Sequence, residues 1–298
     1  MKLDCEGCAG CCVDWRPLSP AAGGTDRRSR RPSLDGAYNL VPLTRDEVAG
    51  FLDRGMGDAP VPRLFEPAET DDRVTVQGVE VAAVGDRPVF MVGLRRAPKP
   101  VAPVGTDEPR WLETCAFLDP ETLQCRIHGD DAYPDTCSTY PGQNLALGVE
   151  TECERVENAG GGERLLDDEP PEDVPAPAFG PHALGATVFA LPDPDRLPEG
   201  AIARLREETT TAADRAPFLG AAAGSRPGSL QVDEERDAEA ADAVREADSW
   251  VGRALDGWSD HAKAVSKEVG DSADSSSRVG LAHEVEDDAG APSTPGWE

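Results

Sequence analysis

Apolar and polar positions alternate between Arg73 and Leu94. The runs Val-Thr-Val-Gln-Gly-Val-Glu-Val and Pro-Val-Phe-Met-Val-Gly-Leu are rich in β-branched residues. Alternation of this kind predicts strands, because successive side chains of a strand point to opposite faces of a sheet. Gly78 and the pair Gly85-Asp86 are turn formers between the runs. The segment therefore predicts two or three antiparallel strands.

A short helix is predicted just before these strands. Thr44 and Glu47 have the spacing of a capping box, in which each side chain satisfies a backbone N–H of the first helical turn. Two glycines, Gly55 and Gly57, are expected to end the helix. Its apolar face would consist of Val48, Phe51 and Leu52.

Helical periodicity returns in the second half of the chain, over residues 198–215 and more clearly over residues 233–269. In the longer stretch, apolar residues recur at spacings of three and four. We expect this stripe to pack on the rest of the protein, and the alternative is that it binds a partner protein. The stripe consists of Val244, Ala247, Val251, Leu255, Trp258, Ala262, Val265 and Val269.

Composition divides the chain into four regions. Aromatic residues make up 5% of the chain, with 27 prolines and 30 glycines, which argues against one large core. We expect an α+β protein: a small, irregular, metal-stapled cysteine domain with a short antiparallel sheet, followed by an α-helical C-terminal region. The predicted boundaries are a cysteine domain over 1–155, an acidic Pro/Gly-rich linker over 156–197, a helical region over 198–269 and a disordered acidic tail over 270–298. An exposed loop is predicted from Arg16 to Asp35.

The charge of the chain is strongly negative. It has 57 acidic and 29 basic residues, a net charge of −28, and four of the basic residues are lysines. An acidic chain that uses arginine in place of lysine is typical of proteins kept soluble in concentrated salt, so we expect a halophilic source. The same charge argues against nucleic acid and anionic membranes as partners.

The sequence also predicts a reducing compartment. Residues 1–4 provide no apolar segment of a secretory signal, and the longest strongly apolar stretch, Val89–Leu94, is far shorter than the roughly 20 residues that cross a bilayer. We therefore expect a cytoplasmic protein without membrane spans. Disulfides are disfavoured in such a compartment, so the cysteines are expected to be thiols.

The eight cysteines form the most informative pattern for function. Two residues between cysteines allow a tight turn to aim both sulfurs at one point, as tetrahedral metals and iron–sulfur clusters require. The later cysteines follow turn formers, and loops are where metal ligands are expected. The sequence therefore predicts a metal site formed by Cys5, Cys8, Cys11, Cys12, Cys115, Cys125, Cys137 and Cys153.

The number of metal sites stays open at this point. Cys11 and Cys12 are adjacent, and adjacent side chains of extended backbone point to opposite sides, so they would more naturally serve two sites. Two zinc sites, a pair of clusters, or one cubane with spare thiols all satisfy the pattern. The tight run of three thiols favours an iron–sulfur cluster over zinc, although the fourth cysteine followed by proline of bacterial ferredoxins is absent.

These motifs resemble the CxxCxxCC cysteine-cluster proteins of the YkgJ type. The resemblance covers residues 1–155 and includes Cys5-Glu-Gly-Cys8-Ala-Gly-Cys11-Cys12, Cys115-Ala-Phe-Leu, Cys125-Arg-Ile-His128, and Cys137 preceded by Tyr133-Pro134. That family is described as a zinc- or iron-chelating domain. The resemblance implies metal binding and implies no particular reaction. His128 stands where that family usually has an aromatic residue, so we expect it beside the site and not among the ligands.

Three classes of function follow from this pattern. The first is a metal-binding protein that transfers electrons through an iron–sulfur cluster, and the second is a structural zinc module that binds a partner through its helices. The third is an enzyme that uses the cluster. The chain contains no P-loop, dinucleotide fingerprint, G-x-S-x-G or H-E-x-x-H, which argues against a conventional hydrolase or dehydrogenase. Trp15 and Trp111 flank the two cysteine blocks and are expected to shield the site from water.

Overall fold

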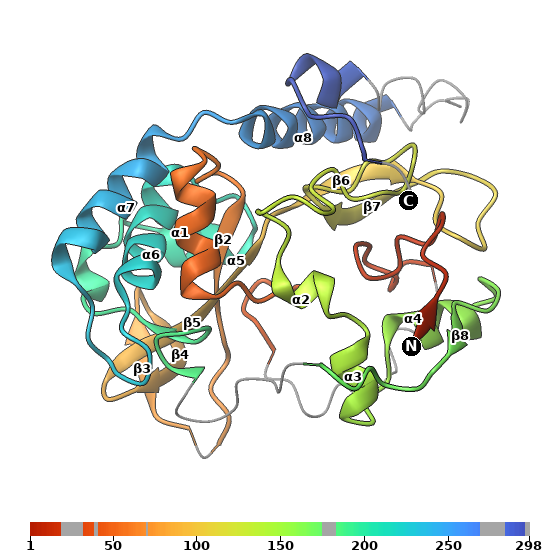
Figure 1. Ribbon diagram of the computed structural model, residues 1–298. Coiled ribbons are helices and arrows are strands. Elements are labelled where there is room, and N and C mark those ends of the chain that lie inside the picture. Colours follow the sequence, from red (N-terminus) through yellow and green to blue (C-terminus); the bar gives the residue numbers. More distant parts are fainter. Residues whose placement is uncertain (19–31, 39–40, 70, 175–182, 269–283, 296–298) are drawn as a thin grey trace. The chain divides into compact units, whose positions relative to one another are not determined.

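The computed structural model describes residues 1–18, 32–38, 41–69, 71–174, 183–268 and 284–295 (Figure 1). Its contacts divide the chain into two units, each built from separate stretches of sequence. The first unit contains residues 1–25, 96–177 and 250–298, and the second contains residues 26–95 and 178–249. The chain is therefore of mixed α and β structure with antiparallel sheets, as the pattern predicted.

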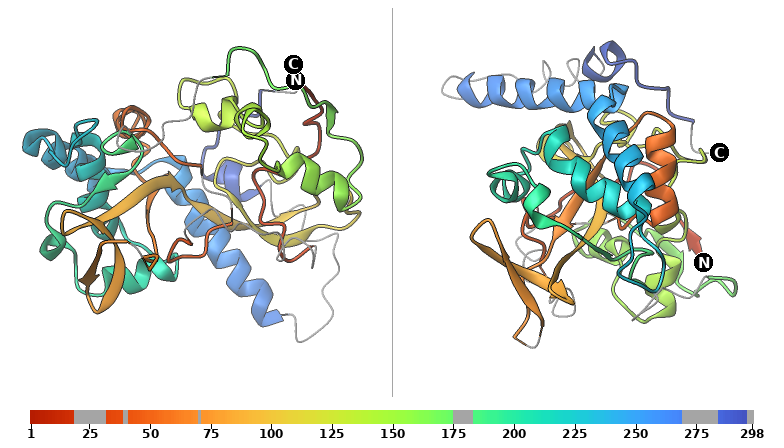
Figure 2. Two further views of the ribbon diagram at one scale, coloured as in Figure 1. Left: turned by 90° about the horizontal axis from the view of Figure 1, so that it is seen from below. Right: turned by 90° about the vertical axis from the view of Figure 1, so that its left-hand side faces the viewer.

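The second unit is built around an antiparallel sheet in the order β2-β5-β4-β3, with β9 paired to β5. Phe90 of β5 contacts Phe189 of β9 in a tilted arrangement and Phe218 of α6 edge-on, with ring centroids 5.6 and 5.0 Å apart. Figure 2 shows the β3–β4 hairpin extending from this sheet. The elements are α1 (Arg45–Asp53), β2 (Pro60–Leu64), β3 (Arg73–Val76), β4 (Val79–Val84), β5 (Arg87–Leu94), β9 (Phe189–Ala190), the 3-10 helix Pro194–Arg196, α5 (Ala201–Arg206), α6 (Ala212–Gly224) and α7 (Glu234–Glu246).

Two local predictions in this unit are confirmed. The alternating segment 73–94 forms the three strands β3, β4 and β5, with turns at the predicted glycines. Thr44 caps α1 as predicted: its hydroxyl accepts from the backbone N–H of Glu47, and the Glu47 carboxylate accepts from the backbone N–H of Thr44. The predicted apolar residues Val48, Phe51 and Leu52 are the buried face of the helix.

The predicted helices over 198–215 and 233–269 are each interrupted. The first divides into α5 and α6, because Glu208 adopts a positive φ of 56° and Thr211 begins a new helix with its own capping box. The second divides into α7 and α8 at residues 247–249. There the carboxylate of Asp58 accepts hydrogen bonds from the backbone N–H and the hydroxyl of Ser249, at 3.0 and 2.5 Å. A contact with a distant residue thus fixes a break that helical periodicity did not reveal.

The first unit is less regular and contains two small antiparallel sheets. In one, β6 pairs with β7 from Arg96 opposite Cys115 to Val101 opposite Arg110, and α8 packs on β6. In the other, β1 pairs with β8. The elements are β1 (Lys2–Leu3), β6 (Arg96–Val101), β7 (Arg110–Cys115), α2 (Asp135–Ser138), α3 (Gly142–Ala146), α4 (Glu152–Asn158), β8 (Leu165–Asp167) and α8 (Trp250–Glu268).

Part of the apolar stripe of the long helical stretch is buried inside the protein. Ala240, Ala241 and Val244 are buried on α7, which packs against α6. On α8, Val251, Leu255 and Trp258 are buried, and Trp258 is 1% exposed. Of the predicted stripe, Val244, Val251, Leu255 and Trp258 are buried, whereas Ala247, Ala262 and Val265 are half-buried and Val269 lies outside the described residues.

The prediction of a disordered tail is wrong for residues 284–295. Residues 284–288 are helical, and Val285, Glu286 and Ala289 are buried. The acidic composition suggested disorder, but one of these carboxylates has buried cationic partners in the first unit. Residues 269–283 and 296–298, which the same prediction included, lie outside the described residues.

The remaining boundaries also differ from those predicted from the composition of the chain. The predicted cysteine domain of 1–155 contains residues 26–95, which belong to the second unit. The predicted linker over 156–197 contains the strands β8 and β9 and a 3-10 helix. Most of the loop predicted from Arg16 to Asp35 lies outside the described residues. Within the part of the chain that the structure describes, no helix has the length and apolar character needed to cross a membrane.

Two glycines in helices of the second unit provide a test of this packing. A Cβ added at Gly220 of α6 would lie 2.5 Å from the backbone oxygen of Asp237 on α7, so the helices approach too closely for any side chain there. Gly220→Ala should therefore lower the free energy of unfolding by about 1–3 kcal/mol through overpacking.

Gly50→Ala on α1 is the matched control, because a Cβ there meets only the end of the Arg54 side chain at 3.0 Å. This variant should be neutral or gain up to about 1 kcal/mol from helix propensity. Urea unfolding followed by circular dichroism measures both. Equal effects of the two substitutions would contradict the proposed contact between α6 and α7.

Candidate functional site

All eight cysteines lie in the first unit, although they come from two stretches of sequence separated by the strands of the second. Every one of them is a free thiol. Cys8 and Cys153 are buried, Cys5 and Cys11 are exposed, and the other four are half-buried. The predicted site residues are therefore in one compact body, without disulfides.

The N-terminal cysteines are carried by consecutive tight turns. The backbone N–H of Cys8 donates to the Cys5 oxygen at 3.1 Å, and that of Cys12 donates to the Ala9 oxygen at 2.9 Å. The buried indole of Trp15 donates to the Gly10 oxygen at 3.0 Å and so fixes the conformation of the cysteine run. Trp15 therefore shapes this run as well as covering it.

Gly10 brings this run close to the helix that carries Cys153. A Cβ at Gly10 would lie 2.6 Å from the side chain of Val156 on α4, so a larger residue would displace the helix. Cys153 lies three residues before Val156 and thus on the same face of α4. The close contact between α4 and Gly10 therefore explains why Cys153 lies near Cys5 and Cys8.

A second backbone connection brings Cys12 to Cys115. After the cysteine run, Val13 forms a bridge with Thr114, and the backbone N–H of Cys115 donates to the Cys12 oxygen at 2.8 Å. The chain after Cys12 thus runs antiparallel to the end of β7 through one isolated bridge. Cys125 returns to the same place, because it forms a bridge with Leu118 across the loop that begins at Cys115.

Electrostatic interactions define a first group of thiols. Although Cys5 is exposed as a residue, partial desolvation of its sulfur by the surrounding protein raises its pKa to about 11, and repulsion from Cys11 and Cys8 adds to the effect. Burial likewise raises the pKa of Cys153, followed by repulsion from Cys11, Cys8 and Cys5. These four residues, Cys5, Cys8, Cys11 and Cys153, therefore share one neighbourhood.

A second group lies beyond Cys11. Burial raises the pKa of Cys125 to about 12, and Cys115 and Cys11 contribute by repulsion. Cys115 and Cys125 also raise the pKa of Cys12. Cys137 on α2 belongs here through Tyr133, whose hydroxyl pKa is raised by burial and then by Cys137, Cys125, Cys11 and Cys12. The second group is therefore Cys12, Cys115, Cys125 and Cys137.

Cys11 and Cys12 lie at the junction of the two groups. Their sulfurs are 3.8 Å apart. A hydrogen bond from the Cys12 thiol lowers the pKa of Cys11 and raises that of Cys12, so Cys11 is the thiol of this pair that ionises first. Cys11 interacts with thiols of both groups, whereas Cys12 interacts with Cys11 and with Cys115 and Cys125 of the second group.

The described residues contain no group of three or more His, Cys, Asp or Glu side chains already arranged as a cage for a metal ion. The thiols are neighbours, but they are not in coordinating positions. His128 is exposed and packs edge-on against Tyr133, with ring centroids 5.0 Å apart. His261 lies on α8, and His182 and His283 lie outside the described residues.

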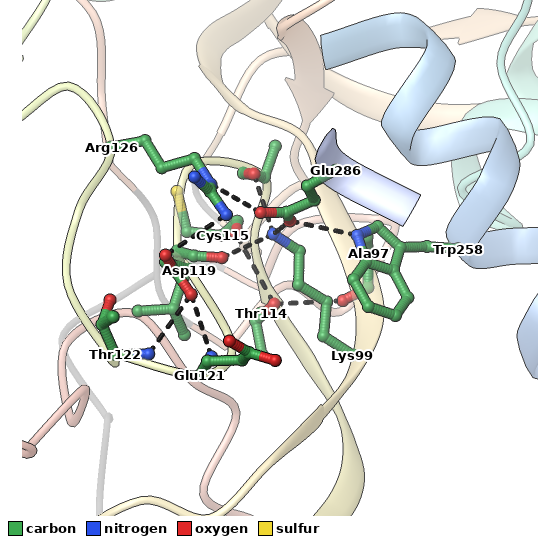
Figure 3. Close-up of polar contacts among 12 residues, drawn as sticks. Ala97, Lys99, Thr114, Cys115, Asp119, Glu121, Thr122, Arg126, Trp258 and Glu286 are labelled. Atoms are coloured by element: carbon green, nitrogen blue, oxygen red, sulfur yellow. Dashed lines mark hydrogen bonds and ion pairs between the residues drawn. The ribbon is translucent and has the colours of Figure 1, made fainter. Parts of the chain in front are cut away.

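A buried ionic cluster next to the second group was not predicted from the sequence (Figure 3). Lys99 of β6 and Arg126, the neighbour of Cys125, both contact Glu286 of the C-terminal segment. Arg126 also pairs with Asp119 at 3.2 Å. The one available signal was Lys99 itself, which is one of four lysines in a chain that otherwise uses arginine.

Trp111 and Trp258 cover this cluster. Their rings meet edge-on with centroids 6.1 Å apart, and the Lys99 ammonium lies 5.9 Å from the Trp258 ring centroid. Lys99 also lowers the pKa of Cys115 and Cys125, which partly offsets the effect of burial. The shielding role expected of Trp111 thus applies to the ionic cluster.

The whole chain, residues 1–298, matches the profile of a family of unknown function, DUF7531, and the protein belongs to that family. The family description names no metal, ligand or reaction, so it does not bear on the resemblance to YkgJ-type proteins. Comparison with curated proteins found no match, and comparison with solved structures found none either.

The raised thiol pKa values predict how the stability of the metal-free protein depends on pH. Cys5 and Cys125 titrate at about 11 and about 12 in the folded state, against 9.0 for an unperturbed thiol. Between these values the folded state binds more protons than the unfolded state. The contribution of these two thiols to the free energy of unfolding should therefore be constant below about pH 9 and fall as the pH rises above it.

Urea unfolding in reductant and chelator, at intervals from about pH 8 to about pH 11, measures this slope. Cys125→Ser removes one raised thiol and should make the decline shallower. A free energy of unfolding that holds or increases above pH 9 would contradict the burial of these thiols.

Proposed function

We propose that this protein binds metal through its cysteine thiolates, as an iron–sulfur cluster protein, with zinc as the alternative metal. One observation carries the proposal: four cysteines from the first twelve residues and four from residues 115–153 gather in one unit, as free thiols that interact electrostatically. Thiolates are the soft ligands that iron–sulfur clusters and zinc prefer.

The energetics of the thiols favours a cation in this place. Desolvation and mutual repulsion raise the pKa of most of them, including Cys5, Cys125 and Cys153, so in the absence of a cation these three thiols are protonated at neutral pH. A bound metal neutralises neighbouring thiolates and so removes the cause of the repulsion. Metal binding should therefore release protons and stabilise the first unit.

Because no three ligands are prearranged among the described residues, binding must also draw the thiols together. The N-terminal run is a series of short turns, and Gly10 and the backbone bond from Cys115 to Cys12 already hold this run near α4 and the loop at Cys115. Metal and fold are then coupled, as in other small domains stapled by metal.

The two groups of thiols support two sites of four ligands each. Cys5, Cys8, Cys11 and Cys153 would form the first, and Cys12, Cys115, Cys125 and Cys137 would form the second. This division agrees with the sequence argument that Cys11 and Cys12 serve different sites. Two clusters held by neighbouring residues would be close enough for electron transfer, whereas two zinc ions would act as staples.

Anaerobic purification followed by metal analysis and absorption spectroscopy tests the proposal. Brown protein containing iron and sulfide is expected, and colourless protein with stoichiometric zinc would support the alternative. Zinc titration of the reduced, metal-free protein should release protons, which calorimetry in buffers of different ionisation enthalpy detects. Protein that folds fully after chelation and binds neither metal would refute the proposal.

Single substitutions test the division into two sites. Cys8→Ser should lose the metal of the first site and keep that of the second, and Cys125→Ser should do the reverse, so each variant is the control for the other. Metal content per chain should drop by about half in each case, since one of two four-ligand sites loses a thiolate. Complete loss of metal in both variants would indicate one shared centre.

A further inference from the structure

The C-terminal segment, residues 284–292, makes its strongest contacts through one carboxylate. Glu286 is fully buried, and three donors from separate parts of the first unit converge on it (Figure 3). Lys99 Nζ of β6 donates to Oε1 at 2.5 Å, and Trp258 Nε1 of α8 donates to the same oxygen at 3.1 Å. Arg126 Nε donates to Oε2 at 2.6 Å.

The same two cations hold the loop that carries Cys115 and Cys125. The Lys99 ammonium donates its other hydrogens to the oxygens of Ala116 and Leu118, at 2.9 and 2.6 Å. Arg126 follows Cys125 directly, and its Nη2 pairs with Asp119 in the middle of the loop. Asp119 in turn accepts from the backbone N–H groups of Glu121 and Thr122.

The charges of this cluster balance when Glu286 is in place. Lys99 and Arg126 carry two positive charges, and Asp119 and Glu286 carry two negative charges, all on side chains less than a tenth exposed. Without Glu286, a buried cation would lack a counter-charge, and the cost of burying an unpaired charge is high. The loop would then open so that the cation could reach water.

Further contacts fix the segment at both ends of this carboxylate. Arg126 Nη1 donates to the Pro292 oxygen at 2.7 Å, and Arg253 of α8 donates to the Ala289 oxygen at 3.0 Å. Gly257 of α8 has no side chain where Val285 packs, since a Cβ there would lie 2.9 Å from Val285. The segment is therefore seated in a fitted position on the first unit.

We propose that Glu286 is a positioning residue for the thiol-bearing loop of residues 115–126, and that segment 284–292 is the clamp that closes this loop. The clamp fixes the two ends of the loop, and with them Cys115 and Cys125, relative to β6 and α8. Its importance for metal rests on the proposed function, because it would hold two ligands of the second site.

The test uses the full-length, reduced, metal-free protein, so that it does not depend on metal binding. Glu286→Gln keeps the size of the side chain and removes its charge, and Glu284→Gln on the exposed side of the same helical turn is the matched control. Alkylation by iodoacetamide at one pH is followed for each cysteine by mass spectrometry. Cys8 and Cys153, from the first group, are internal controls in each sample.

In Glu286→Gln, Cys115 and Cys125 should be alkylated about tenfold faster than in Glu284→Gln, because loss of hydrogen bonds to a charged group promotes local opening. Cys8 and Cys153 should react at unchanged rates. Equal acceleration of all cysteines would show a general loss of stability, and unchanged rates at Cys115 and Cys125 would show that the clamp holds nothing. Either result would overturn the proposal.

Hydrogen exchange of the unmodified protein decides the question if Glu286→Gln does not fold. The backbone N–H groups of Leu118, Asp119 and Arg126 in the loop and of Gly290 and Ala291 in the clamp are all hydrogen-bonded. The two sets of amides should show similar protection factors, since one local opening exposes both. Clamp amides that exchange more than about a hundredfold faster than loop amides would overturn the proposal, because the loop would then stay closed without the clamp.

In the zinc titration, Glu286→Gln should bind the second equivalent more weakly and the first as before. If neither variant nor parent binds metal while the alkylation result holds, the proposed function fails and the clamp stands. If metal binds to both proteins alike and alkylation is unchanged, the clamp fails and the proposed function stands.

Discussion

The buried carboxylate of Glu286 is the interaction on which the irregular first unit depends. The described part of this unit has two short sheets, and most of its cysteines lie on turns or short helices. One carboxylate joins β6, α8 and the loop after Cys115, and each contact is a charged or indole hydrogen bond in a water-free place. Hydrogen bonds to charged groups are strong and directional, so they can fix a loop that packing alone would leave free.

The thiols depend on the same balance of charge. Most of them are made harder to ionise by burial and by each other, while Lys99 acts in the opposite direction on Cys115 and Cys125. Repulsion among neighbouring thiolates is avoided either by keeping the thiols protonated or by adding a cation. The eight thiols form no disulfides, and the described residues contain no preformed cage, so under the proposed function the fold would supply proximity and the metal would complete the site.

In this strongly acidic chain, the buried cations neutralise carboxylates that are themselves buried. Besides Arg126, buried or partly buried ion pairs join Arg63 with Asp35 and Arg204 with Asp214 in the second unit. In each pair the carboxylate is almost inaccessible to water, so the arginine compensates a charge that could not otherwise be buried. Arginine suits this role, because its planar group can bind two acceptors at once. The predicted adaptation to concentrated salt concerns the outer surface and leaves these pairs untouched.

The sequence by itself determined the features that depend on near neighbours: the alternation that forms β3 to β5, the capping box at Thr44, and the tight turns of the cysteine run. It also identified the cysteines as the residues of interest. The tertiary structure alone decided which distant residues meet. Ser249 breaks a helix because Asp58 lies beside it, Gly10 admits α4 and hence Cys153, and an acidic tail becomes ordered because Lys99 and Arg126 need a counter-charge. Such pairings follow from the position of groups far apart in the chain, and composition and periodicity carry no record of that position.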